Sequence, residues 1–272
     1  YREAIEGYAE LEEEIEVLKK YDDGYSSHAS SVSEIVNIHH PKKLSLKVLE
    51  IRQDTQSTKT FKLVSTENYL PPFQAGQYIN LFVEVDGVRT SRPYSIASPP
   101  NQTGYYEITV RWINDGFVSN HLLDDVKVGD TFESSSPSGH FHYNPLFHGK
   151  DLVFLAGGSG ITPFMSMIRE VTDRGLDRHI HLIYGSRNED DIIYRLELEE
   201  RAKQHNNLTV SFVISEPPKD YQGLTGFINM KLMKELLGSL SDKMFYICGP
   251  EVMYNFCLPE LEKLSVLRRK IR

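Results

Sequence analysis

The chain has 272 residues, a formal net charge of −8, 40% hydrophobic residues and 25% charged residues. This length fits two compact domains better than one, and the composition is ordinary for a soluble globular protein. The acidic balance argues against nucleic acid or an anionic membrane as the main partner. No run approaches the roughly 20 apolar residues of a membrane span, and no signal peptide is visible. Two cysteines, Cys248 and Cys257, make no disulfide framework, so we expect a reducing, cytoplasmic compartment.

Residues 1–42 are predicted to form a helix and a linker. Apolar residues recur at helical spacing over 1–20 between glutamate-rich faces, so the helix either packs on its own domain or docks onto a partner. Residues 21–34 are polar and predict the linker. His39 and His40 are a possible metal pair, but no second cluster lies at ligand spacing, so we expect no metal site. The first residue is not Met and the last residues are a basic cluster, so we expect a fragment of a longer protein.

Residues 43–148 are predicted to form a β domain. Apolar and polar residues alternate as they do in half-buried antiparallel strands, and an Asp-Gly pair at 86–87 predicts a hairpin turn. Regularly spaced short strands favour a small antiparallel barrel or sandwich. The expected strands are 44–52, 58–64, 76–83, 106–112 and 130–134, and the expected helix is 119–126.

Residues 149–272 are predicted to form an α/β domain, because short apolar strands alternate with helical segments. This order indicates a doubly wound parallel sheet covered by helices on both faces, with ligands at the carboxyl ends of its strands. The expected strands are 152–156, 181–184, 209–214 and 244–247, and the expected helices are 163–172, 194–205, 229–237 and 251–265.

Three motifs lie in an order that favours electron transfer between two bound nucleotides. In Arg92–Ser95, an Arg, an aromatic ring and a hydroxyl at i, i+2 and i+3 can together serve one flavin. The glycine-rich segment Gly157–Pro163 follows an apolar strand and offers bare backbone N–H groups to a phosphate pair. Cys248–Pro250 ends the last strand.

Together with Gly116–Ser119, these motifs resemble the ordered set of the ferredoxin–NADP reductase superfamily, over about residues 43–265. The short barrel looks more like the bacterial oxygenase-reductase and flavohaemoglobin-reductase branches than the plant-type enzymes. The resemblance implies FAD in the β domain, NADH or NADPH in the α/β domain, and hydride transfer between them.

The resemblance also implies a role for each motif. Arg92 would neutralise the FAD pyrophosphate, Tyr94 would lie against the flavin ring, and Ser95 would donate near the N5 atom. Cys248 would orient the nicotinamide rather than act as a nucleophile. Ser95, Tyr94 and Cys248 are the expected catalytic residues. The expected cofactor-binding residues are Arg92, Pro93, Tyr94, Ser95, Gly116, Val118, Ser119, Gly157, Gly158, Gly160, Thr162, Pro163, Ser186, Arg187, Cys248, Gly249 and Pro250.

The nucleotide preference depends on Arg187. This side chain can pair with a 2′-phosphate, or it can form a surface ion pair with a nearby acid. The residues at 188–191 (NEDD) are mostly acidic and would repel a 2′-phosphate, so the sequence favours NADH over NADPH.

We therefore expect an FAD-dependent NAD(P)H oxidoreductase that passes electrons to an iron–sulfur centre or a partner redox protein. Two cysteines cannot supply the four thiolates of a [2Fe–2S] cluster. The resemblance implies that such a centre can lie in a C-terminal ferredoxin-like domain, which we expect to be absent from this chain. One alternative is a free-flavin or haem-protein reductase of the same fold. Another is a non-catalytic interaction subunit that docks through the N-terminal helix.

Overall fold

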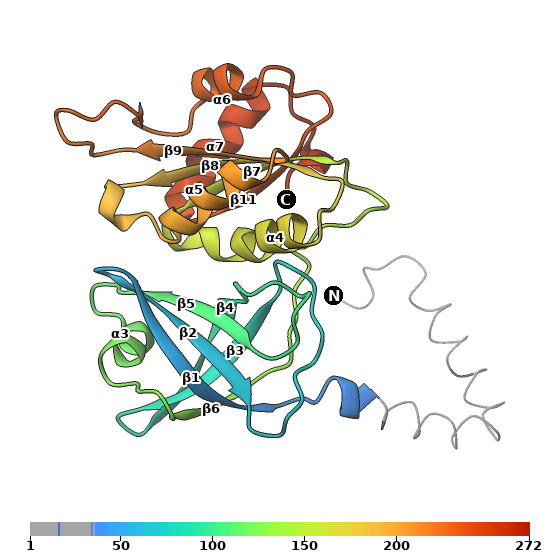
Figure 1. Ribbon diagram of the computed structural model, residues 1–272, viewed down its shortest axis with the longest axis vertical. Coiled ribbons are helices and arrows are strands. Elements are labelled where there is room, and N and C mark those ends of the chain that lie inside the picture. The colour runs from blue at the N-terminus through green and yellow to red at the C-terminus, as the bar shows by residue number, and fades with distance from the viewer. Residues whose placement is uncertain (1–15, 17–33, 35) are drawn as a thin grey trace. The chain divides into compact units, whose positions relative to one another are not determined.

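A computed structural model describes residues 16, 34 and 36–272. The predicted helix of residues 1–20 and the linker of residues 21–34 therefore lie outside the described residues, apart from Glu16 and Glu34. Lys43–Arg272 form one compact unit with a β domain followed by an α/β domain (Figure 1). Within the described residues, no helix is long and apolar enough to cross a membrane.

The β domain is an antiparallel sheet that curls on itself. Over residues 43–148 the strand order is β4-β3-β6-β1-β2-β5. The two outer strands meet where Ile96, just after β4, bridges Ile108 of β5. This closure gives the predicted barrel-like architecture. The elements are β1 (Leu44–Thr55), β2 (Thr58–Ser65), β3 (Tyr78–Val85), β4 (Val88–Ser95), β5 (Tyr106–Arg111), α3 (Phe117–Asp124) and β6 (Thr131–Ser134).

Two local features of the β domain can be compared with the sequence prediction. The Asp-Gly turn is confirmed: Asp86 and Gly87 have φ angles of 50° and 77°, as a tight hairpin turn between β3 and β4 requires. The helix predicted at 119–126 instead spans Phe117–Asp124, because Gly116 in an extended conformation forms its N-cap.

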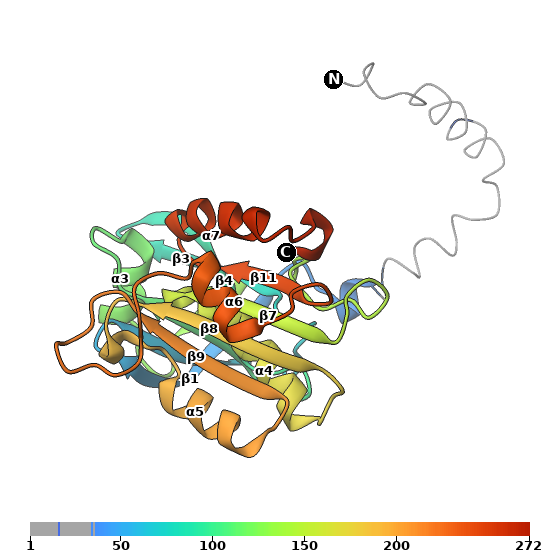
Figure 2. The same cartoon turned by 90° about the horizontal axis from the view of Figure 1, so that it is seen from above.

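The α/β domain is the predicted parallel sheet with helices on both faces (Figure 2). In residues 149–272 the strand order is β10-β9-β8-β7-β11. Phe154 and Phe164 stack with 4.6 Å between ring centroids in the core under α4, while Met233 and Leu261 pack in the core under α6 and α7. The elements are β7 (Asp151–Gly157), α4 (Ile161–Asp173), β8 (His179–Ser186), α5 (Arg195–Gln204), β9 (Leu208–Ile214), β10 (Leu224–Thr225), α6 (Met230–Leu237), β11 (Met244–Cys248) and α7 (Glu251–Lys263), with 3₁₀ turns η2 (Gly158–Gly160), η3 (Glu189–Asp191) and η4 (Arg268–Lys270).

A buried histidine fastens the segment between the domains to the sheet. The Nδ1 atom of His148 accepts hydrogen bonds from the backbone N–H of Asn144 at 3.0 Å and from the Tyr246 hydroxyl at 2.5 Å. Burial lowers the pKa of His148 below its usual value. Both observations favour the neutral ring in the folded protein.

We expect this histidine to make stability fall as the pH falls. Since the pKa in the folded state is depressed, the unfolded chain takes up the proton first, so stability is lost below a pH of about 6.5. His148→Gln should lose stability at neutral pH but show a shallower fall in melting temperature on acidification. Equal slopes for the two proteins would contradict this assignment.

Candidate active site

The first motif lies on β4, at an outer edge of the antiparallel sheet. Arg92 is exposed, and its Nη1 atom donates to Thr90 Oγ1 at 3.0 Å and to the Ser91 carbonyl at 2.8 Å. Among the described residues, no carboxylate pairs with this guanidinium within 4 Å. Tyr94 packs against the barrel core, and burial raises its pKa to about 12, so the hydroxyl stays protonated. The Arg92 guanidinium is therefore oriented by neighbouring oxygens, but no carboxylate of the described residues neutralises its charge. The partly exposed ring of Tyr94 lies two residues further along the same strand.

The second motif of this domain forms the start of α3. Gly116 has φ −73° and ψ 99°, and a Cβ there would lie 2.1 Å from Ser119 Oγ and 2.9 Å from the Ile113 carbonyl oxygen, so the position favours glycine. Val118 is buried in the barrel core, so only its backbone can face a ligand. The first turn carries no acidic residue, which leaves its backbone N–H groups suited to an anion.

The glycine turn after β7 is fixed by a buried tyrosine that the sequence analysis did not single out. Gly158 has a φ of 53°, and its carbonyl accepts a hydrogen bond from the Tyr184 hydroxyl at 2.8 Å. Thr162 donates to the Ser159 carbonyl at 2.7 Å, and Pro163 follows in the first turn of α4. The protein's own hydrogen bonds therefore fix the shape of the turn.

The glycine turn and the Cys-Gly-Pro motif pack directly together. A Cβ on Gly160 would lie 2.1 Å from the Cys248 carbonyl oxygen and 2.6 Å from the Gly249 nitrogen. A Cβ on Gly157 would lie 3.1 Å from Pro250 Cδ. Segments about 90 residues apart thus meet at the carboxyl edge of the sheet, where ligands of such sheets bind.

The surroundings of Cys248 do not activate its thiol as a nucleophile. Burial raises the pKa of its thiol to about 11, so the thiol is protonated at neutral pH. This agrees with a packing or orienting role. Cys257 lies on α7 and is buried in the core that this helix forms with α6.

The adenosine end of the predicted site lies one strand away, because Gly185 pairs with Gly157 across β7 and β8. Ser186 is buried, and its hydroxyl donates to the Asn188 carbonyl at 3.0 Å. Arg187 is exposed and pairs with Glu216 at 3.3 Å. Of the two possibilities for Arg187, the structure contains the surface ion pair.

Arg111 is a further residue of the site, at the end of β5. Its Nη2 atom pairs with Asp191 at 3.2 Å, and its Nη1 atom would lie 2.7 Å from a Cβ on Gly158. A barrel-domain cation therefore lies beside the glycine turn of the other domain. The sequence gives little indication that Arg111 belongs to the site, since a polar residue at the end of a strand usually faces solvent.

The residues present fit two nucleotides. Among the described residues, a cation that pairs with no carboxylate, a partly buried aromatic ring and a helix start without acidic residues suit the pyrophosphate and ring of a flavin. A turn with three glycines, one of which would meet backbone atoms if it carried a Cβ, suits a second pyrophosphate that approaches the backbone closely.

Comparisons with known proteins agree with this geometry. Residues 45–143 match the oxidoreductase FAD-binding domain, and residues 154–258 match the oxidoreductase NAD-binding domain. An NADH-cytochrome b5 reductase 1 from Dictyostelium discoideum is 30% identical over 244 residues, covering 89% of this chain and 84% of that protein. The reductase component of a phenol 2-monooxygenase from Pseudomonas is 34% identical over 203 residues, covering 74% of this chain and 56% of that protein. A ferredoxin NADP+ reductase from Neisseria gonorrhoeae, solved with FAD and NADP, gives a TM-score of 0.72 at 25% identity and covers 85% of this chain and 97% of that one.

The fold, the order of the motifs and these matches define a two-domain flavin- and nicotinamide-dependent oxidoreductase. The chain belongs to the ferredoxin–NADP reductase superfamily. It is an FAD-dependent NAD(P)H oxidoreductase that transfers electrons to a redox partner.

Proposed function

We propose that the chain carries electrons from NADH through FAD to a one-electron redox protein, either an iron–sulfur or a haem protein. The observation that carries this proposal is the contact of the glycine turn with Cys248–Pro250, beside an Arg111 that reaches across from the flavin domain. FAD held by these residues would supply the redox chemistry, which is acceptance of a hydride from NADH and one-electron transfer to the acceptor protein.

In this proposal the chain's own residues hold and orient the two nucleotides. Arg92 and the backbone at the start of α3 bind the FAD pyrophosphate, Tyr94 covers the flavin ring, and Ser95 donates toward it. The turn at Gly157–Gly160 binds the nicotinamide nucleotide, and Cys248 packs beside its ring.

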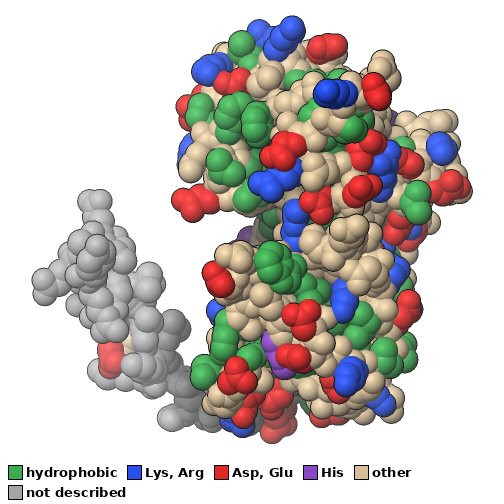
Figure 3. Space-filling view, turned by 90° about the vertical axis from the view of Figure 1, so that its left-hand side faces the viewer, with side chains coloured by type: hydrophobic (Ala, Val, Ile, Leu, Met, Phe, Trp, Pro, Cys, Tyr) green, Lys and Arg blue, Asp and Glu red, His purple; other side chains and the backbone are tan. Residues whose placement is uncertain are grey.

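The acceptor is proposed from the relatives. One is named for cytochrome b5 and another for a phenol monooxygenase, so both haem and oxygenase partners occur among proteins similar to this one. With two cysteines in 272 residues, a [2Fe–2S] centre would have to lie in a separate protein or a further domain. Acidic and basic side chains are interspersed on the face shown in Figure 3, so charge on that face does not single out an acceptor. A cytoplasmic location stays a prediction.

Steady-state NADH oxidation with different acceptors tests this proposal. We expect rapid reduction of ferricyanide and of at least one protein acceptor, a [2Fe–2S] ferredoxin or a b-type cytochrome, and slower reduction of free FMN. A chain that reduces free flavin faster than any protein acceptor would instead be a flavin reductase.

NADH should be preferred over NADPH, because Glu216 already neutralises Arg187. Glu216→Gln frees this guanidinium for a 2′-phosphate. Since exposed ion pairs contribute about 0.2–1 kcal/mol, the ratio of kcat/KM for NADPH to that for NADH should rise by a factor of about 1.4 to 5. The control is Glu84→Gln, which breaks a similar exposed pair with Arg89 on the barrel. An unchanged ratio would remove Arg187 from the nucleotide site.

A further inference from the structure

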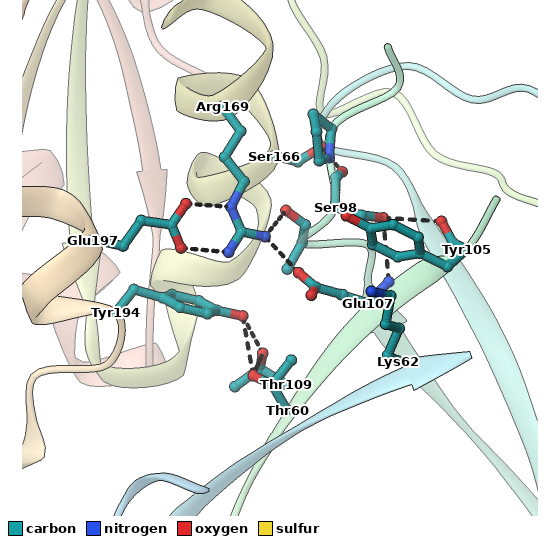
Figure 4. A network of polar contacts seen from close by, with 12 residues as sticks. Thr60, Lys62, Ser98, Tyr105, Glu107, Thr109, Ser166, Arg169, Tyr194 and Glu197 are labelled. Carbon is teal, nitrogen blue, oxygen red and sulfur yellow. Dashed lines mark hydrogen bonds and ion pairs between the residues drawn. The ribbon is translucent and has the colours of Figure 1, made fainter. Parts of the chain in front are cut away.

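A buried cation joins the two domains away from the nucleotide motifs. Arg169 of α4 is 7% exposed, and its guanidinium bonds to groups of both domains (Figure 4). Its Nε and Nη2 atoms bind both carboxylate oxygens of Glu197 on α5, at 2.7 and 2.6 Å. Its Nη1 atom binds the Glu107 carboxylate on β5 at 2.6 Å and the Ala97 carbonyl at 3.0 Å.

Each partner of Arg169 is needed for this arrangement. A buried charge is tolerated only when it is paired and hydrogen-bonded, and removal of one partner leaves an uncompensated charge. Glu197 is shared with Arg201 at 2.9 Å, and Arg201 also pairs with Asp173 at 2.6 Å, so three carboxylates surround the two guanidinium groups. Burial would raise the pKa of Glu197, but the hydrogen bonds from Arg169 and Arg201 outweigh it and lower the pKa. The ion pair between Glu197 and Arg169 is therefore charged on both sides at neutral pH.

Tyr194 makes a second link beside Arg169. It lies before α5 in the left-handed conformation, with a φ of 60°, which a non-glycine residue rarely adopts. Its hydroxyl bonds to Thr109 on β5 and to Thr60 on β2, at 3.3 Å for Thr60. The Arg169 guanidinium lies 5.2 Å from its ring centroid. We call Arg169, Glu107, Glu197 and Tyr194 the interdomain latch.

One face of β5 supplies a run of these contacts. Glu107, Thr109 and Arg111 alternate along the strand and contact Arg169, Tyr194 and Asp191 of the α/β domain. The residues between them are apolar and lie in the barrel core. This follows from the two-residue period of a strand, which turns one face to each domain.

The same strand connects the two nucleotide sites. On the flavin side, the Ala97 backbone N–H donates to the Glu107 carbonyl at 2.7 Å, two residues after Ser95. On the nicotinamide side, α4 runs directly from the glycine turn to Arg169. A shift at the latch would therefore move the flavin strand relative to the turn that holds the nicotinamide nucleotide.

We propose that Arg169 is a positioning residue for hydride transfer: the latch fixes the distance and angle between the flavin strand and the nicotinamide turn. This inference rests on the proposed function. Misplacement by about 1 Å can cost about a hundredfold in rate, so a joint that leaves both binding sites intact still controls the chemical step.

Two substitutions weaken the latch from different sides, and a third tests its geometry. Glu107→Gln removes the carboxylate of the barrel domain, and Tyr194→Phe removes the hydroxyl bonds while keeping the ring. Arg169→Lys keeps the charge but loses the bidentate geometry. The matched control is Arg174→Lys. Arg174 is the residue that caps the C-terminal end of α4, and its exposed side chain pairs with Glu170 of the same helix.

The test compares these FAD-loaded proteins by stopped flow under anaerobic conditions. We expect each latch variant to bind FAD and NAD+ as the wild type does. The rate at which NADH bleaches the flavin should fall about tenfold or more, and the isotope effect on this rate with NADH deuterated at the transferred hydride should change. The rate at which ferricyanide reoxidises the reduced flavin should stay unchanged. The long-wavelength absorbance of NAD+ stacked on dithionite-reduced flavin should weaken, and this readout does not depend on turnover.

Other outcomes overturn the inference. Bleaching at the wild-type rate in both Glu107→Gln and Tyr194→Phe would show that the latch does not set the geometry. A rate that falls only in proportion to lost FAD would show a role in stability alone. If the wild type is not bleached by NADH, the proposed function itself fails and the inference falls with it.

Discussion

Gly160→Ala should weaken NADH binding about five- to a hundredfold while leaving FAD bound. The added Cβ would lie 2.1 Å from the Cys248 carbonyl oxygen, so the end of β11 must move away from the start of α4. Overpacking of this kind typically costs about 1–3 kcal/mol, which corresponds to about five- to a hundredfold in an equilibrium constant. The FAD motifs lie in the other domain and do not touch this contact.

Gly104→Ala is the matched control, because a Cβ there meets no atom within 4 Å. Isothermal titration with NAD+ and the visible spectrum of both purified variants give the two affinities. Unchanged nucleotide binding in the Gly160 variant would mean that the turn is not the nicotinamide site. Loss of FAD as well would mean that the whole fold is disturbed.

Arg92→Ala should release FAD. The guanidinium is held by Thr90 and by the Ser91 carbonyl, and no carboxylate of the described residues neutralises it. Charge-assisted hydrogen bonds contribute about 1.5–3 kcal/mol, so the FAD dissociation constant should rise about ten- to a hundredfold. We expect a protein that is purified nearly colourless and becomes yellow again with added FAD.

Arg89→Ala provides the comparison for this prediction. It lies on the same strand and is 89% exposed, but it pairs with Glu84. This variant should keep FAD. Equal loss in both variants would point to general destabilisation of β4, and retention of FAD in both would remove Arg92 from the pyrophosphate site.

The order of elements was predictable because it depends on local periodicity. Alternating residues predicted the antiparallel strands, and apolar runs with intervening helical segments predicted the parallel sheet. The short strand β10 was missed, because two residues at 224–225 are too few to show an alternation of apolar and polar side chains. The extended segment at Arg92–Ser95 was recognised by its motif, although its full strand extends back to Val88.

The contacts between the domains were not predictable from the sequence. Glu107, Thr109 and Arg111 alternate with apolar residues, which is also the pattern of a strand with one face in solvent. Only the fold shows that this face meets the α/β domain. Arg169 similarly lies in an ordinary helical pattern, and its partner Glu107 is 62 residues away in the sequence. Long-range pairing of charges leaves no local signal.

The roles assigned to Ser95, Tyr94 and Cys248 stay predictions from the resemblance to the family. The structure contributes the surroundings of each side chain. Tyr94 packs on the barrel core, and Cys248 lies against the glycine turn with a thiol that burial keeps protonated.

The most direct test of the central claim is an anaerobic titration of the FAD-loaded protein with NADH, followed in the visible flavin absorbance, with NADPH in parallel. We predict that NADH bleaches the flavin stoichiometrically and that NADPH does so more slowly. A protein that binds FAD but stays oxidised with both nucleotides would contradict the account.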